Sequence, residues 1–186
     1  MFMESGLWGA AAVDANGNAG AVYLAIDAPM DGDDISDYAF ARIEGSTSYG
    51  YAGYSGTGLG DNSWVIGAPG AAEAYLVHRP SGDSSVKYAD ATLYGDSGSR
   101  FGHDIAALGD VTGDGVDDYA VSAPYADGYG GAVYILSADA SGSVDATRAG
   151  ITLSGDAGDW VGWSVASAGD VNGDGTNDIV VGAPGT

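Results

Sequence analysis

Apolar residues in this chain come in short runs that are separated by glycine-rich polar segments. Three of the runs, at 20–24, 72–76 and 131–135, carry a tyrosine as their fourth residue, and two others, at 119–122 and 179–182, lead into an Ala-Pro pair. No long stretch has the apolar spacing of an amphipathic helix, and the chain contains 33 Gly and 12 Tyr. Short apolar runs bounded by turn residues are typical of β-strands, so the pattern predicts an all-β protein with many tight turns.

The chain also repeats itself. Residues 95–124 and 155–184 are identical at about half of their positions, at a constant offset. Each unit is predicted to hold four strands: an inner strand before an acidic loop, a buried strand that ends at Ala-Pro, a tyrosine strand, and an outer strand such as 91–94 or 150–153. Four antiparallel strands per unit is the size of a propeller blade.

A nine-residue acidic loop, 110–118 in one copy and 170–178 in the next, joins the inner and buried strands. Positions 1, 3, 5 and 9 carry side-chain oxygens, position 6 is Gly, and position 7 can offer its backbone carbonyl. Hard Ca²⁺ requires such a donor set, and three carboxylates that converge without a cation would repel one another. We therefore predict two calcium sites, with the ligands Asp110, Thr112, Asp114, Val116, Asp118, Asp170, Asn172, Asp174, Thr176 and Asp178.

Two other interpretations of these loops are weaker. Asp-Gly and Asn-Gly pairs favour polar hairpin turns that bind nothing, but a turn requires one such pair and not a full alternating set of ligands. An EF-hand needs a bidentate acid at position 12, where the chain has Val121 and Val181. The flanking runs are predicted strands, so the loop joins two strands of a hairpin and not two helices.

Phe101-Gly102, the acidic loop and Ser122-Ala123-Pro124 together resemble an FG-GAP repeat, the unit of the seven-bladed β-propeller in integrin α subunits and of many bacterial surface proteins. The next copy reads Val161-Gly162, the second loop and Gly182-Ala183-Pro184, and an earlier, weaker copy has Tyr49-Gly50 and Gly67-Ala68-Pro69. When that copy is aligned on Ala-Pro, its loop positions hold Ser55, Thr57, Leu59 and Ser63, so we predict no metal there.

This template divides the chain into two full blades with a partial blade at each end. The predicted segments are 1–44 (later strands of a blade), 45–94 (blade with a degenerate loop), 95–154 (blade with a calcium loop) and 155–186 (first strands and a calcium loop). Because small propellers have about four blades, this set does not close a ring alone. The chain is then a piece of a longer protein, or its partial blades join those of another copy into a ring or filament, or the blades form an open stack.

The net charge of −21, with 26 acidic and five basic residues, excludes nucleic acid and anionic membranes as natural partners, because affinity for phosphate rests on Lys and Arg. There is no cysteine and no apolar stretch long enough for a membrane helix, so we expect no disulfide and no membrane insertion. Met1-Phe-Met-Glu is no signal peptide. Calcium loops of this kind suit the calcium-rich medium outside cells, so we expect an extracellular or cell-surface location.

Catalysis is not expected. Gly95-Asp-Ser97 resembles a serine-protease nucleophile motif, with His78 or His103 as a conceivable base. In the next copy, however, the positions of Ser97 and His103 hold Ala157 and Trp163, so the motif is a recurring turn.

The sequence therefore predicts a calcium-stabilised, non-catalytic module for adhesion or surface assembly, with a protein or glycan ligand. One alternative is a non-catalytic propeller segment of a larger secreted enzyme such as a hydrolase. Another is a carbohydrate-binding module, since exposed aromatic rings can stack on sugars. Its platform would use Tyr49, Tyr51, Tyr54, Trp64, Tyr125 and Tyr129, while Trp160 and Trp163 are expected to seal adjacent blades.

Overall fold

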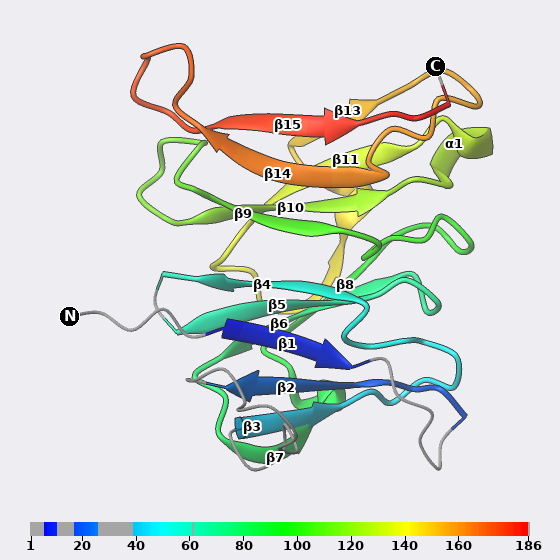
Figure 1. Ribbon diagram of the computed structural model, residues 1–186, viewed down its shortest axis with the longest axis vertical. Helices are drawn as coiled ribbons and strands as arrows, with labels where there is room; N and C mark the ends of the chain where they lie inside the picture. The colour runs from blue at the N-terminus through cyan, green and yellow to red at the C-terminus, as the bar shows by residue number, and fades with distance from the viewer. Residues whose placement is uncertain (1–5, 11–16, 26–38, 61, 186) are drawn as a thin grey trace, which may run out of the picture.

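The computed structural model describes residues 6–10, 17–25, 39–60 and 62–185, and for 6–10 the backbone alone. These residues form four β-sheets that are stacked along the long axis of the molecule (Figure 1). The first sheet holds β1 (Gly6–Ala10), β2 (Ala21–Ala25) and β3 (Ala39–Glu44), and the second holds β4 (Ser55–Leu59), β5 (Ser63–Ala68), β6 (Glu73–His78) and β8 (Ala91–Tyr94). The third holds β9 (Ile105–Gly109), β10 (Asp118–Ala123), β11 (Ala132–Ser137) and β13 (Ile151–Ser154), and the fourth holds β14 (Ser164–Gly169) and β15 (Asp178–Gly182).

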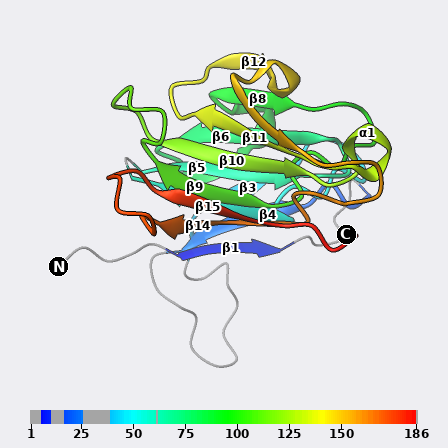
Figure 2. The same ribbon diagram turned by 90° about the horizontal axis from the view of Figure 1, so that it is seen from above.

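The predicted fold class is confirmed. In the second and third sheets the four strands run antiparallel in the predicted order of inner, buried, tyrosine and outer strand, and a short helix, α1 (Ala126–Tyr129), follows β10. The first and fourth sheets hold part of such a set. Seen from above, the inner strands β4 and β14 lie toward one side of the stack, and the outer strand β8 lies toward the other (Figure 2). The four predicted segment boundaries remain predictions.

Each complete blade also sends a segment back to the blade before it, which the four-strand template did not predict. The strand β7 (Gly82–Ser85) leaves the second blade and pairs in parallel with β3, and β12 (Gly142–Asp145) leaves the third and pairs in parallel with β8. A single 3₁₀ turn follows each strand, η2 (Val86–Tyr88) and η3 (Ala146–Arg148). We call each strand with its turn a clasp, so the two clasps are 82–88 and 142–148.

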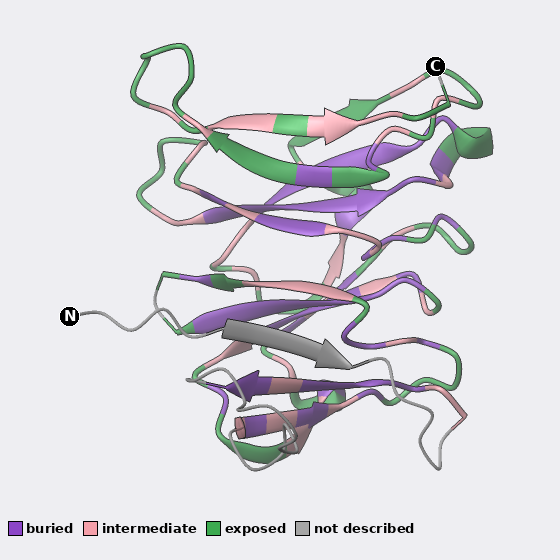
Figure 3. Cartoon of the chain, viewed as in Figure 1, coloured by how far each residue is buried: buried purple, intermediate pink, exposed green. Residues whose placement is uncertain are grey.

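The core lies between the blades rather than within one of them. Alternate residues of the buried strand β5 face opposite neighbours: Trp64 and Ile66 pack with the first sheet, whereas Val65 packs with the third. All six residues of β5 and of β10 are buried, while most residues of β14 and β15 are not (Figure 3). Every blade therefore depends on the next one to cover its far face, as in other repeat architectures.

The position of the Phe-Gly motif in the weak copy was predicted wrongly. Gly102 donates its N–H to the carbonyl of Ser122 (3.0 Å), and Gly162 donates to Gly182 (3.1 Å). The glycine that makes the same bond in the second blade is Gly53, to Gly67 at 2.9 Å, and not Gly50. These three glycines share φ values of +85°, +84° and +88°, which L-residues rarely adopt, so the motif there reads Ala52-Gly53.

Candidate metal loops and aromatic pocket

Both acidic loops lie on the same side of the stack, on the left in Figure 1, where β9 turns into β10 and β14 turns into β15. Each loop bends sharply at two glycines. Gly113 and Gly115 have φ values of +77° and +89°, and Gly173 and Gly175 have +80° and +92°. Because L-side chains are strained in this region, the Gly-Asp-Gly element gives both loops the same shape.

In the first loop the side chain at position 1 organises the turn. Asp110 Oδ1 accepts hydrogen bonds from the N–H groups of Gly113 (2.7 Å) and Asp114 (3.0 Å), and its Oδ2 accepts one from Gly115 (2.8 Å). At the other end, Asp118 Oδ2 accepts from the N–H groups of Val111 (3.0 Å) and Thr112 (2.9 Å). Carboxylates that accept several backbone hydrogen bonds are strongly oriented, so these side chains point into the loop.

The second loop repeats this set of bonds. Asp170 accepts from the N–H groups of residues 173, 174 and 175 at 2.7 to 3.1 Å, and Asp178 Oδ2 accepts from Val171 (2.8 Å) and Asn172 (3.3 Å). In both loops the Oδ1 atom at position 5, Asp114 or Asp174, accepts from the N–H two residues later. The structure therefore gives the predicted ligands at positions 1, 5 and 9 equivalent places in the two copies.

In the second loop two carboxylates converge on one polar group. Asn172 Nδ2 donates to Asp174 Oδ2 at 3.1 Å and to Asp178 Oδ1 at 3.2 Å. Neither of these two oxygens has a recorded bond to the backbone of the loop. A donor between two carboxylates occupies the kind of place that a cation prefers, and the amide oxygen of Asn172 accepts from the N–H of Asp174 at 2.8 Å. The donor set thus fits a hard cation in its chemistry.

The loops do not form a closed cage in this structure. Across the described ranges, no three His, Cys, Asp or Glu side chains come close enough together to hold a metal ion. Thr112, Val116 and Thr176 take part through backbone N–H groups that bond to carboxylates of their own loop. The ten predicted ligands and the calcium ions therefore remain predictions.

Position 8 of each loop contacts the preceding blade, and the sequence did not single it out. Asn177 Nδ2 donates to the carbonyl of Leu108 at 2.7 Å, and Asp117 Oδ2 accepts from the N–H of Gly60 at 3.3 Å. The partners lie on β9 and next to β4, the inner strands of the blades before. A signal was present, since both residues occupy the same loop position and both are polar, but neither belongs to the alternating ligand set.

The weak copy has lost its loop, and its alignment on Ala-Pro was wrong. Ser55, Thr57 and Leu59 do not lie in a loop but in β4, which pairs with β5 along its whole length as far as Leu59 opposite Ser63. The second blade thus joins its inner and buried strands through residues 60–62, where the other two blades use 110–117 and 170–177. Of the four positions that the alignment on Ala-Pro assigned to the loop, only Ser63 is placed correctly. It begins the buried strand β5, as Asp118 begins β10 and Asp178 begins β15.

An aromatic pocket lies at the opposite end of the inner strands. His103 precedes β9 and the acidic loop follows it, so the two features are separated by the length of the strand. Rings from three successive blades form a column there, with Tyr54 5.3 Å from His103 and His103 5.2 Å from Trp163 between centroids. The cavity has a volume of about 500 Å³ and is lined by Tyr51, Tyr54, Arg100, His103, Tyr125 and Trp163.

The structure brings three residues of the predicted aromatic platform together. Tyr51, Tyr54 and Tyr125 line the pocket, but Trp64 is only 2% exposed and packs in the core between the first and second sheets. Trp160 stacks on Trp163 at 5.4 Å, and Trp163 in turn contacts His103 of the preceding blade. Trp163 thus links two blades as predicted, although both indoles remain more than a third exposed.

Neither histidine contacts Ser97, the serine of the protease-like motif, in the part of the chain that the structure describes. His78 Nδ1 lies 2.5 Å from Ser63 Oγ, its cross-strand neighbour, and His103 lies between Tyr54 and Trp163. Burial lowers the pKa of His103 below its usual 6.5, nearby Arg100 lowers it further, and Asp104 acts in the opposite direction. No bond from either imidazole to Ser97 is recorded among the residues that the structure describes.

Comparison with known proteins supports this description. The family model for the FG-GAP repeat matches residues 101–136 and 161–186. The chain carries FG-GAP repeats. Over 163 residues it is 32% identical to integrin alpha-3 of Cricetulus griseus, and over 121 residues it is 37% identical to integrin alpha-E of Mus musculus. These matches cover 81% and 59% of this chain but only 15% and 10% of the two integrins. The FG-GAP chain thus spans a small part of each relative's length.

A third relative, integrin alpha-IIb of Mus musculus, is 30% identical over 163 residues, which is 77% of this chain and 16% of that protein. Integrin-like FG-GAP repeats agree with the blades seen in the structure. Among the residues that the structure describes, no helix has the length and apolar character needed to cross a membrane.

Proposed function

We propose that this chain is an extracellular interaction module whose blades are stabilised by Ca²⁺ in the two acidic loops. The observation that carries the proposal is the repetition of one bond pattern in two loops that differ in sequence. In both loops the carboxylates at positions 1 and 9 are oriented by the backbone N–H groups of the loop. The side chains at positions 1, 3, 5 and 9 all carry an oxygen that can bind a metal ion. Calcium prefers flexible all-oxygen sites of this kind.

When bound, a calcium ion would neutralise carboxylates that otherwise repel one another across a short loop. Positions 1, 3, 5 and 9 would supply side-chain oxygens, and Val116 or Thr176 would supply a carbonyl. Because position 1 follows the inner strand and position 9 opens the buried strand, the ion would join the two strands at their ends. The resulting gain in the free energy of unfolding follows mass action and reaches about 2.7 kcal/mol per site when calcium exceeds its dissociation constant a hundredfold.

The contacts at position 8 would carry this effect to the neighbouring blade. Asn177 follows the carbonyl-donating position of the second loop and bonds to Leu108 of the third blade. A loop that is held in one conformation keeps this side chain in reach of its partner, whereas a repelled, open loop does not. Calcium would thereby stabilise the packing of blades as well as each hairpin.

The proposed role is binding and assembly rather than catalysis. The relatives are named integrins, and the chain offers a rigid set of blades with loops at both ends. A net charge of −21 favours a partner with a basic or neutral surface and disfavours nucleic acid. Self-association through the incomplete end sheets belongs to the same proposal, because exposed strand edges pair readily.

The test is a calcium titration by calorimetry, together with thermal unfolding in calcium and in chelator. We expect two sites per chain and a lower melting temperature in chelator. Asp114→Asn and Asp174→Asn should each weaken one site. The matched control is Asp127→Asn, which removes the same charge in α1, on the opposite side of the stack from the loops. Heat of binding that is identical in the wild type and both loop variants would refute the proposal.

The aromatic pocket favours a second candidate, the binding of an acidic saccharide. Of the six residues that line the pocket, only Arg100 carries a permanent charge, and none is acidic, although the chain has 26 acidic residues. The guanidinium carbon of Arg100 lies 5.8 Å from the centroid of the Tyr125 ring. Ring faces stack on sugars and a guanidinium binds a carboxylate.

Binding of uronic-acid and neutral oligosaccharides tests this second candidate. Arg100→Gln should remove the preference for the acidic sugar, and Trp163→Ala should weaken both ligands. Equal binding by the wild type and both variants, or no binding at all, would rule the pocket out as a saccharide site.

A further inference from the structure

Outer strands of the first two sheets are covered by the clasp of the following blade. β3 receives β7 in a parallel register that begins with Ala41 opposite Gly82, and β8 receives β12 in the same register, beginning with Ala91 opposite Gly142. Both clasps open with a glycine at positive φ, +61° and +69°. Two independent copies of one arrangement define what the outer edge of a blade requires.

The 3₁₀ turn of each clasp adds a buried apolar anchor. Its first residue, Val86 or Ala146, is fully buried and packs in the core between two blades. The residue before it caps the turn: the side chain of Asp145 accepts from the N–H of Thr147 at 3.1 Å, and Ser85 accepts from Lys87 at 3.5 Å. The clasp is therefore a short motif: glycine, three extended residues of which the last caps a turn, and a small apolar residue.

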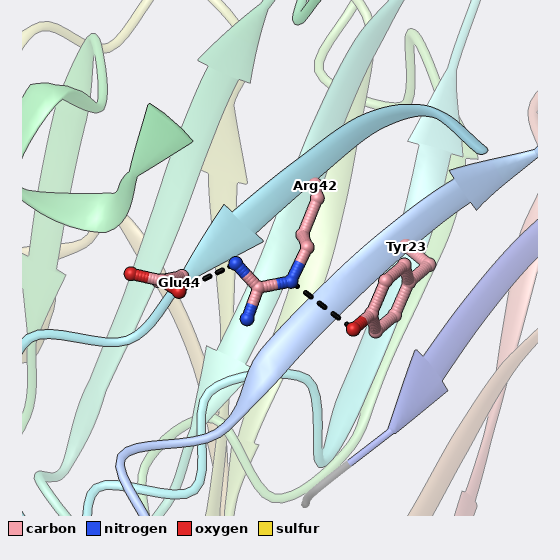
Figure 4. A network of polar contacts seen from close by, with 3 residues as sticks. All are labelled: Tyr23, Arg42 and Glu44. Atoms are coloured by element: carbon pink, nitrogen blue, oxygen red, sulfur yellow. Dashed lines mark hydrogen bonds and ion pairs between the residues drawn. The ribbon is translucent and has the colours of Figure 1, made fainter. Parts of the chain in front are cut away.

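The apolar face of an outer strand points toward the next blade. On β3, Ala41 and Ile43 face the core, while Arg42 turns to the other side and bonds through Nε to the Tyr23 hydroxyl at 3.0 Å and through a terminal nitrogen to Glu44 (Figure 4). By register, the counterparts of Ala41 and Ile43 are Ala91 and Leu93 on β8, and Ile151 and Leu153 on β13.

The outer strand of the third blade differs from the other two in one respect. Within the described chain no clasp pairs with β13, and all four of its residues are exposed. Ile43 and Leu93 are 1% and 0% exposed, whereas Leu153 is 38% exposed, and Ile151 is 44% exposed where Ala41 and Ala91 are 2% and 0%. Two apolar side chains of β13 thus stand uncovered at positions that are buried in both other blades, and Ile151 is larger than the alanines that correspond to it.

We propose that the edge of β13 is a docking site for the clasp of a further FG-GAP repeat. The clasp pairs in parallel with β13, with its glycine opposite Ile151 and its fourth residue opposite Ser154. Its small apolar anchor then covers Leu153 on the side that faces the fourth sheet, where Val133 and Ile135 already pack with Val165. The register follows from β7 and β12, and the inference does not depend on calcium.

A synthetic peptide with the sequence of residues 140–150, which contains the β12 clasp, tests the proposal in trans. Added to the whole chain in calcium buffer, the labelled peptide should bind saturably by fluorescence anisotropy. Hydrogen exchange should show new protection of the amides of β13. A peptide with the anchor changed, Ala146→Asp, should bind at least tenfold more weakly.

Two variants of the chain locate the binding. Leu153→Glu should weaken binding of the unmodified peptide at least tenfold, while Val180→Glu, a change of the same kind at a residue that is 56% exposed on β15, should not. If Leu153→Glu does not fold, the pair of peptides still decides the question on the wild-type chain.

Three results would overturn the proposal. They are equal binding of both peptides, protection confined to β8 through exchange with the resident β12, and concentration-dependent self-association of the chain that protects β13 and that the peptide does not compete with. The last would show that a second copy covers this edge without a clasp.

Discussion

The second and third blades solve the same connection in two ways. The second blade passes from β4 to β5 through residues 60–62, and the third passes from β9 to β10 through the acidic loop 110–117. The strands β4 and β5 remain in register as far as Leu59 and Ser63, without the bulge that interrupts the pairing of β9 and β10 between Asp118 and Tyr119. A blade therefore does not need the acidic loop to form its sheet. Where the loop is present, its carboxylates must be satisfied, and that requirement is what the predictions below address.

The largest effect is expected at the first residue of the buried strand. Asp118 is 1% exposed and accepts two backbone N–H groups, so Asp118→Ala should leave both unpaired and destabilise the fold by about 2–4 kcal/mol. The counterpart in the loopless blade, Ser63, has no loop to hold, and Ser63→Ala should destabilise less. Denaturant unfolding of both variants measures the difference. Equal losses would mean that Asp118 is important only as a buried polar residue.

Exchanging the two connections should convert one blade into the other. Replacing residues 110–117 by the 60–62 connection should give a folded chain that binds one calcium ion instead of two. Chelator should lower the melting temperature of this variant less than that of the wild type. The calcium-dependent part of the free energy of unfolding should be smaller by about 2.7 kcal/mol when calcium exceeds its dissociation constant a hundredfold. Calorimetric stoichiometry is the measurement. A folded exchange variant that still binds two ions would place a site outside the predicted loops.

Contacts at position 8 give a smaller difference between the two loops. Asn177→Ala removes a 2.7 Å hydrogen bond to the carbonyl of the buried residue Leu108 and should destabilise the chain by about 1 kcal/mol. Asp117→Ala removes a longer, exposed bond of 3.3 Å to Gly60, and its effect should be a few tenths of that. The order of the two values, from thermal unfolding, is the test. A larger loss for Asp117→Ala would show that the blade before the first loop relies on it more than the distances indicate.

Several parts of this architecture were predictable from the sequence because their signals are local. The short apolar runs and the glycines at the loop bends each lie in a contiguous stretch of sequence, and they predicted the strands and both loops. The constant offset of 60 residues between Asp110 and Asp170 predicted that these stretches form one repeated unit. The positions of the loop carboxylates also followed from spacing alone. Whether those carboxylates enclose a metal ion is a matter of coordination that spacing does not determine.

Other parts were missed because their signals are not local. The clasps pair Gly82 with Ala41 and Gly142 with Ala91, and in both cases three strands lie between the paired segments along the chain. Such parallel pairing leaves little pattern in four residues. In the weak copy, deletion of the loop shifted every position before Ser63 when Ala-Pro was used as the anchor. The hydrogen bond of Gly53, which Gly102 and Gly162 make in the next two blades, reveals the true alignment, and it is visible only in three dimensions.

The smallest expected effect is on the pH dependence of stability. It comes from His103, before the inner strand β9, whereas the loop after β9 carries carboxylates. His103 packs between Tyr54 and Trp163, and burial holds its folded pKa below the unfolded value of about 6.5. As the pH falls through 6.5, the unfolded state takes up the proton first, so this contribution to stability is complete above 6.5 and is lost as the pH falls toward and through the folded pKa. His103→Phe keeps an aromatic ring in the column and should remove this part of the acid sensitivity, while carboxylates titrate at lower pH in both proteins. Imidazole NMR should give a pKa below 6.5 for His103 in the folded chain. A pKa at or above that value would mean that the ring is solvated or paired with Asp104, and that the column does not exclude water from it.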